Sequence, residues 1–261
     1  MKQVALFVIT LFGVTWTLSF LWPPPAQPEN LWVFLPHLLP SVWAPTIIAL
    51  IVTAMMEGTA SVRKELRARL SYRRGAARWL ILAGIVPIIA TAAAVFTTRA
   101  AGDSAPFISR ADMLPMIGLQ VVTGAVGEEL GWRGFLLPRL AKRLGEIKSG
   151  WVMAILWSLW HVPAFFTPGL PHRTMPIMST LLTIGFFGVF LAFVFNRTGQ
   201  SVLATMLAHL LLNIILAAGG VSLSSVVFWR TTAGIYGALA VFTTITSRTR
   251  SSHIANERLP A

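Results

Sequence analysis

The chain has no cysteine among its 261 residues. This absence excludes a disulfide framework, a zinc–thiolate site and a cysteine nucleophile. Charge is also scarce, because Asp, Glu, Lys and Arg make up only 11% of the residues, whereas a soluble domain usually carries about 25%. Hydrophobic residues account for 55% of the chain. The composition therefore predicts that most of this protein is surrounded by lipid rather than by water.

Negative charge is the scarcest kind, with 9 acidic residues against 21 basic ones and a formal net charge of +12. A basic excess can indicate nucleic-acid binding, but here the basic residues lie between apolar runs and not in a separate hydrophilic domain. Lipid headgroups and membrane orientation explain such a distribution better. We therefore expect the lipid bilayer as a partner and no nucleic acid.

Long hydrophobic runs are what the chain has in abundance. We identify eight, which cover residues 4–22, 40–56, 79–97, 113–130, 150–166, 175–195, 200–218 and 226–246. Most are close to the ~20 residues that a helix needs to cross about 30 Å of hydrocarbon. No internal repeat and no separate soluble segment interrupts them. The sequence predicts an all-α bundle of about eight transmembrane helices, with residues 1–261 forming one transmembrane domain.

Basic residues fall in alternate connections between these runs, and this pattern predicts the orientation. One group of connections holds Arg63, Lys64, Arg67, Arg69, Arg73, Arg74, Arg78, Arg139, Lys142, Arg143 and Lys148, and the other only Arg99, Arg110, Arg173 and Arg230. Lys and Arg accumulate in cytoplasmic loops. We therefore expect an integral protein of the cell membrane with both termini in the cytoplasm.

Two of the nine acidic residues, Glu128 and Glu129, stand at the end of an apolar run and are followed by Arg133. Each ionisable group at the centre of a bilayer costs roughly 2.5–3.5 kcal/mol, so such groups usually pair and usually mark a functional site. Glu129 and Arg133 share one helix face and can pair, whereas Glu128 is turned by about 100° toward another neighbour. This predicts that arginine holds Glu129 while Glu128 is free to act on water. The alternative is an interfacial ion pair that caps a helix end.

Two later runs each carry one histidine, His161 and His209, and Asn213 follows His209 by one helical turn. At about 1.5 Å of rise per residue, both histidines fall at a depth similar to that of Glu128. Taken singly, a buried histidine is more often a packing residue and a membrane asparagine a helix–helix hydrogen-bonding residue. Their combination with the glutamates and arginine predicts a shared site. The histidines of the expected loops and tail receive no role: His37, His172 and His253.

Three motifs follow one another on successive runs: Glu-Glu-x-x-x-Arg, Trp-x-x-x-His and His-x-x-x-Asn. In this order they resemble the CPBP intramembrane proteases, also called the Abi or CAAX-protease family, over about residues 113–218. The resemblance implies an eight-helix bundle and endopeptidase activity on a membrane-associated protein or peptide, CAAX proteins included. It also implies catalytic roles for Glu128, Glu129, Arg133, His161, His209 and Asn213. One departure is Trp157, where the family usually has Phe, and we read it as conservative.

Hydrolysis without a cysteine nucleophile indicates direct attack by an activated water. We expect Glu128 and His161 to hold this water, with Glu128 as general base, and His209 and Asn213 to donate hydrogen bonds to the oxyanion. The rival chemistry is zinc bound by Glu128, His161 and His209 with water in the fourth position. We favour no cofactor, since no HExxH motif occurs.

A different class of function is a transporter or channel that uses the same cluster as a proton or cation path. Transporters often show inverted repeats with a matched pair of broken helices, and we find no such symmetry in the sequence.

Overall fold

A computed structural model describes residues 1–26, 31–72, 76–218 and 220–256. Arg73, Arg74 and the side chain of His253, all considered above, lie outside the described part. Within these ranges the chain forms helices and no strand. The expected all-α architecture is confirmed.

Five helices of the described part are long and apolar enough to cross a membrane. They are α1 (Lys2–Leu21), α2 (Leu31–Glu57), α4 (Ala77–Ala100), α8 (Ile177–Arg197) and α10 (Val226–Asn256). Helix α9 (Val202–Ala218) is equally apolar but shorter. Each corresponds to one of the expected runs, so the protein is an integral membrane protein built as a helix bundle.

The run at 113–130 is not the single helix that its hydrophobicity suggests. Helix α5 (Arg110–Thr123) ends at Gly124, whose φ of −133° and ψ of −120° are not helical, and α6 (Ala125–Glu129) starts directly afterwards. A π-helical segment, η1 (Leu130–Leu136), continues from Glu129. Single π-helical turns are rare and occur frequently at functional sites.

The run at 150–166 also differs from expectation, because it forms only the second half of a helix. Helix α7 (Leu137–Trp160) begins well before the run and is kinked at Gly145, which has a φ of 73°. It ends at Trp160, and the short 3-10 helices η2 (Val162–Phe165) and η3 (Pro171–Thr174) follow. A further helix, α3 (Thr59–Arg69), lies in the cationic connection and contains no buried residue.

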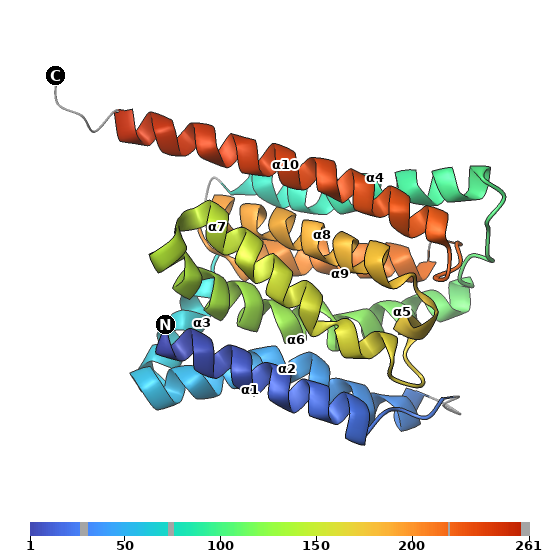
Figure 1. Ribbon diagram of the computed structural model, residues 1–261, viewed down its shortest axis with the longest axis horizontal. Coiled ribbons are helices and arrows are strands. Elements are labelled where there is room, and N and C mark those ends of the chain that lie inside the picture. Colours follow the sequence, from blue (N-terminus) through green and yellow to red (C-terminus); the bar gives the residue numbers. More distant parts are fainter. Residues whose placement is uncertain (27–30, 73–75, 219, 257–261) are drawn as a thin grey trace.

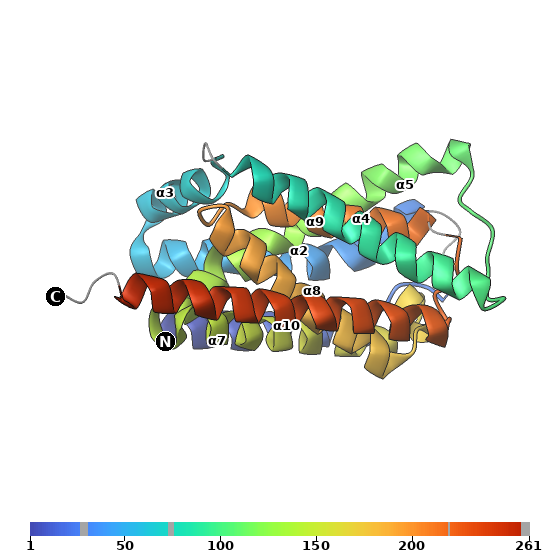
Figure 2. The same cartoon turned by 90° about the horizontal axis from the view of Figure 1, so that it is seen from above.

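The helices pack in layers that place the glutamate-bearing segment inside the bundle. Helices α1 and α2 form one side, α4 and α10 the other, and α6, α7, α8 and α9 lie between them (Figure 1). The beginning of α1, the end of α10 and helix α3 all lie at one end of the bundle, as both views show (Figures 1 and 2). This shared end is consistent with an even number of crossings.

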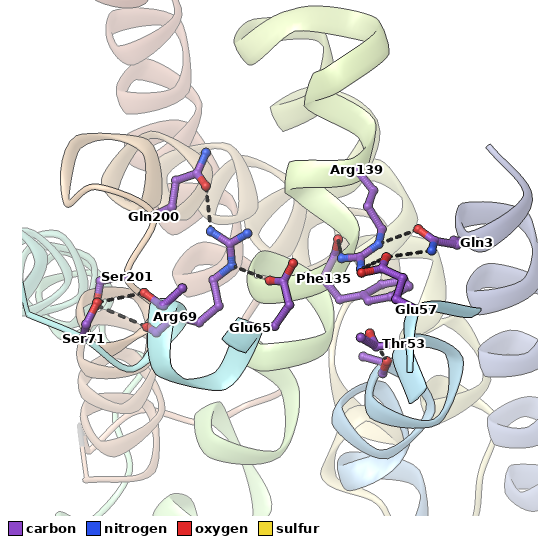
Figure 3. Close-up of polar contacts among 12 residues, drawn as sticks. Gln3, Thr53, Glu57, Glu65, Arg69, Ser71, Phe135, Arg139, Gln200 and Ser201 are labelled. Carbon is purple, nitrogen blue, oxygen red and sulfur yellow. Dashed lines mark hydrogen bonds and ion pairs between the residues drawn. The ribbon is translucent and has the colours of Figure 1, made fainter. Parts of the chain in front are cut away.

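Polar side chains connect the helices at this end (Figure 3). Arg139, in the first turn of α7, donates to Gln3 of α1 over 2.9 Å and to Glu57 of α2 over 2.8 Å. On α3, Arg69 donates to Glu65 over 3.2 Å and to Gln200, in the α8–α9 connection, over 2.6 Å. These contacts fix α1, α2 and α3 against the part of the bundle that holds the glutamates.

We expect the end that carries α3 to face the cytoplasm, because basic residues concentrate in its connections and few lie at the opposite end. Reporter fusions test this orientation. Alkaline phosphatase fused after Arg78 should be inactive and a fusion after Asp103 should be active, since this enzyme requires export. The reverse pattern would show that the topology is inverted.

Candidate active site

Glycines let the glutamate-bearing segment lie directly against α2. A Cβ atom added at Gly127 would lie 2.9 Å from the carbonyl oxygen of Val42, and one added at Gly131 would overlap the backbone of Pro45. Small residues permit this kind of backbone approach between membrane helices. These glycines therefore allow close helix packing beside Glu128 and Glu129.

Glu129 is the centre of a fully buried polar cluster. Its Oε1 accepts a hydrogen bond from Nη1 of Arg133 over 2.8 Å, and both side chains are 0% exposed. The same oxygen lies 3.0 Å from Nδ1 of His209. The expected Glu129–Arg133 pair is present. The sequence predicted that His209 shares a site with the glutamates, but not that it contacts Glu129 directly.

Glu128 has a separate partner. Its Oε2 accepts a hydrogen bond from Nε1–H of Trp157 over 2.8 Å, and its side chain also lines a cavity. The two adjacent carboxylates therefore divide as the helical turn predicts, Glu129 toward arginine and Glu128 toward the cavity. The Trp in place of Phe, read above as conservative, is not conservative in hydrogen bonding, because Phe has no N–H to offer.

His161 follows the last residue of α7, and its ring is held by the backbone. Nδ1 lies 2.8 Å from the carbonyl oxygen of Trp157, so Nδ1 must carry the hydrogen. The other ring nitrogen of a neutral imidazole then has a free lone pair. Aromatic rings surround the imidazole, with ring centroids 5.4 Å away at Trp157 and 4.9 Å away at Trp160.

Asn213 lies where α5 breaks. A Cβ atom at Gly124 would be 2.8 Å from Nδ2 of Asn213, so only glycine lets the amide come this close to the backbone. Asn213, Glu128, His161 and His209 all line the same cavity. The structure thus brings four of the six expected site residues to one space, while Glu129 and Arg133 lie behind it.

This cavity has a volume of about 360 Å³, which is within the usual range of about 300–1,000 Å³ for ligand sites. Most of its wall is apolar or aromatic, and part of it comes from α1 and α2, through residues such as Trp16, Phe34 and Leu38. A largely apolar wall with a few polar groups at one place is the usual character of a binding site.

His172, which received no role above, also lines the cavity. Its ring centroid is 6.0 Å from that of His161, and its Nδ1 is buried without a hydrogen-bond partner among the described residues. Burial lowers the pKa of His172 to about 4, so the ring is neutral at neutral pH. No sequence signal marks this residue, because η3 reaches the cavity only through tertiary folding.

The residues do not fit the alternative zinc site. Among the described residues, no three His, Asp or Glu side chains lie together as metal ligands. Glu128, His161 and His209 therefore do not form a ready ligand set.

Two comparisons bear on this geometry. Residues 110–215 match a family model described as Rce1-like, type II CAAX prenyl endopeptidase. CAAX prenyl protease 2 of Methanococcus maripaludis is 27% identical over 117 residues, which are 42% of this chain and 43% of that protein. The match thus spans less than half of the relative's length.

The family-model match falls on the segment that contains the three motifs, and it agrees closely with the residues 113–218 identified from the sequence. Within it lie α5, α6, η1, α7, α8 and nearly all of α9. Through residues 110–215, the chain is similar to the CPBP family of CAAX-protease-like membrane proteins.

Proposed function

We propose that this protein is an intramembrane endopeptidase that hydrolyses a peptide bond in a membrane-associated protein. The observation that carries the proposal is the position of Glu128. Its carboxylate is separate from the Glu129–Arg133 pair and lines the same cavity as His161, His209 and Asn213. A carboxylate, an imidazole and two further polar groups around one space are the parts that water-mediated peptide hydrolysis requires.

In the proposed reaction, Glu128 takes a proton from a water molecule that also donates to the free ring nitrogen of His161. The water oxygen forms a bond to the scissile carbonyl carbon, and the carbonyl oxygen becomes an oxyanion. Glu128 then returns the proton to the amide nitrogen as the C–N bond breaks. The products are a carboxylic acid and an amine, and the enzyme returns to its starting state.

Asn213 and His209 are the proposed oxyanion donors. The amide of Asn213 can donate directly. His209 engages Glu129 through Nδ1, so its other nitrogen donates toward the cavity only when both ring nitrogens carry a hydrogen. The Glu129 carboxylate, itself held by Arg133, orients the ring that would carry this charge.

The cavity wall indicates a substrate with an apolar segment or a lipid chain near the scissile bond. The matched relative is a CAAX prenyl protease, so we place prenylated CAAX-type proteins among the candidate substrates. We assign the protein to the cell membrane, with both termini in the cytoplasm and residues 1–261 as one domain. The proposal involves no nucleic acid.

The test uses the purified full-length chain and synthetic peptides that end in a CAAX sequence, with and without a farnesyl group on the cysteine. Mass spectrometry should find two products whose summed mass exceeds that of the peptide by one water, as expected when a single peptide bond is hydrolysed. A chain that cleaves neither these peptides nor membrane proteins, but carries protons across proteoliposomes, would support the transporter alternative and contradict the proposal.

Because the described side chains do not assemble three metal ligands, we expect cleavage to be independent of added metal. Dialysis against a chelator should leave the turnover rate within about twofold of its starting value, a difference that corresponds to less than ~0.5 kcal/mol. Metal analysis of the purified protein provides the control. Loss of cleavage on chelation with recovery on addition of zinc would show that the metal-free mechanism is wrong.

A further inference from the structure

Trp157 contacts four of the charged or titratable side chains of the candidate site: Glu128, Arg133, His161 and His209. Its indole N–H donates to Glu128, and the guanidinium carbon of Arg133 lies 4.2 Å from the centre of its ring. Its ring centroid lies 5.4 Å from that of His161 and 5.3 Å from that of His209. We propose that Trp157 is a positioning residue, whose N–H holds the Glu128 carboxylate in the orientation from which it acts on water. This inference rests on the proposed function.

The indole is fixed by its surroundings. It is 2% exposed, in the last turn of α7, and packs on the far side against Phe187 at a centroid separation of 6.3 Å. Arg133 lies over the ring, and the rings of His161 and His209 meet it nearly at right angles. A ring enclosed in this way cannot turn its N–H elsewhere, so the bond to Oε2 of Glu128 fixes the carboxylate and not the reverse.

Glu128 has few other restraints. The backbone around Glu128 belongs to the five-residue helix α6, which lies between the break at Gly124 and the π-helical segment. Its side chain borders the cavity, where a carboxylate without a donor could turn about its terminal bonds. A donor to a charged acceptor gives one of the stronger hydrogen bonds in proteins. The N–H thus selects one carboxylate orientation and leaves the second oxygen for water.

The residue type allows a clean test, because Phe keeps an aromatic ring at this position and removes only the N–H and the second ring. In Trp157→Phe we expect kcat to fall about tenfold, which corresponds to ~1.4 kcal/mol, with KM unchanged, since the N–H acts on Glu128 and not on the substrate. The matched control is Trp151→Phe on the same helix, whose N–H donates to the neutral hydroxyl of Thr244 over 3.1 Å. It should leave both constants unchanged.

A spectroscopic measurement tests the contact without relying on activity. In a ¹⁵N-tryptophan sample, Glu128→Gln should move the indole N–H resonance of Trp157, because a neutral amide oxygen attracts the hydrogen less strongly than a carboxylate does. The resonance of Trp151 should stay in place. Trp157→Phe and Trp151→Phe assign the two signals by deleting them.

The possible outcomes separate the inference from the proposed function. A lower kcat in Trp157→Phe together with a moved resonance in Glu128→Gln supports the positioning role. Parental kcat in Trp157→Phe, or an unmoved Trp157 resonance, overturns that role even if Glu128→Gln is inactive. If Glu128→Gln cleaves at the parental rate, Glu128 is not the base, and both the positioning role and the proposed chemistry are overturned.

Discussion

Glu128→Gln should abolish peptide cleavage while the protein stays folded. Glutamine has nearly the same shape and still offers an oxygen to the N–H of Trp157, but it cannot accept the proton of the attacking water. A general base typically contributes roughly 10²–10⁴ in rate, so we expect turnover to fall by at least about 10²-fold. Initial rates with a peptide substrate, measured beside a thermal melt in detergent, check both parts of the expectation.

Glu65→Gln is the matched control for this substitution. Glu65 pairs with Arg69 on α3, and its side chain is 33% exposed, so the same chemical change there should affect neither cleavage nor the melt. His161→Ala should resemble Glu128→Gln, because it removes the second group that holds water. Cleavage by Glu128→Gln at close to the parental rate would show that the base lies elsewhere.

Removal of either partner of the buried ion pair should destabilise the bundle strongly. Glu129→Ala leaves the positive charge of Arg133 without a partner, and Arg133→Ala leaves the negative charge of Glu129 without one. Both side chains are 0% exposed. Breaking a buried pair costs about 3–5 kcal/mol. Reversible unfolding with a denaturing detergent should show that the free energy of unfolding falls by this amount in both single variants. Both should also lose activity.

The pair Glu65–Arg69 again supplies the control, because it has the same four-residue spacing in a partly exposed position. Exposed pairs contribute about 0–1 kcal/mol to stability, so Glu65→Ala should lower the free energy of unfolding by no more than this. A double change of Glu129 and Arg133 to leucine should destabilise less than either single change to alanine, since no charge stays unpaired. Parental stability of both single variants would mean that water reaches the pair.

Features that depend on near neighbours along the chain could be predicted from the sequence. Hydrophobic length predicted the helices α1, α2, α4, α8, α9 and α10. The spacing of Glu129 and Arg133 predicted their pairing, because residues four apart share a helix face. The rotation of about 100° between adjacent helical residues also predicted that Glu128 and Glu129 face different neighbours. These features follow from the geometry of one helix.

Features that depend on packing between distant segments could not be predicted. The break at Gly124 lies inside a predominantly apolar run, and the π-helical segment starts at the end of that run, so hydrophobic periodicity marks neither feature. Nothing local indicates that His209 meets Glu129, or that the N–H of Trp157 points at Glu128. Trp and Phe are similar in ring character but not in hydrogen bonding, and the bond from Trp157 to Glu128 depends on how α6 and α7 pack together.

The cavity is assembled from two parts of the chain, and the family model matches only one of them. The titratable groups lie in residues 110–215, which the family model matches, whereas α1 and α2, which close one side of the cavity, lie outside it. Trp160 joins the two parts by donating to Thr15 of α1 over 2.9 Å. The reactive groups and one wall of the cavity therefore come from different segments of the chain. We therefore expect substitutions of cavity-lining residues in α1 and α2 to change which substrates fit, and to leave the titratable groups in place.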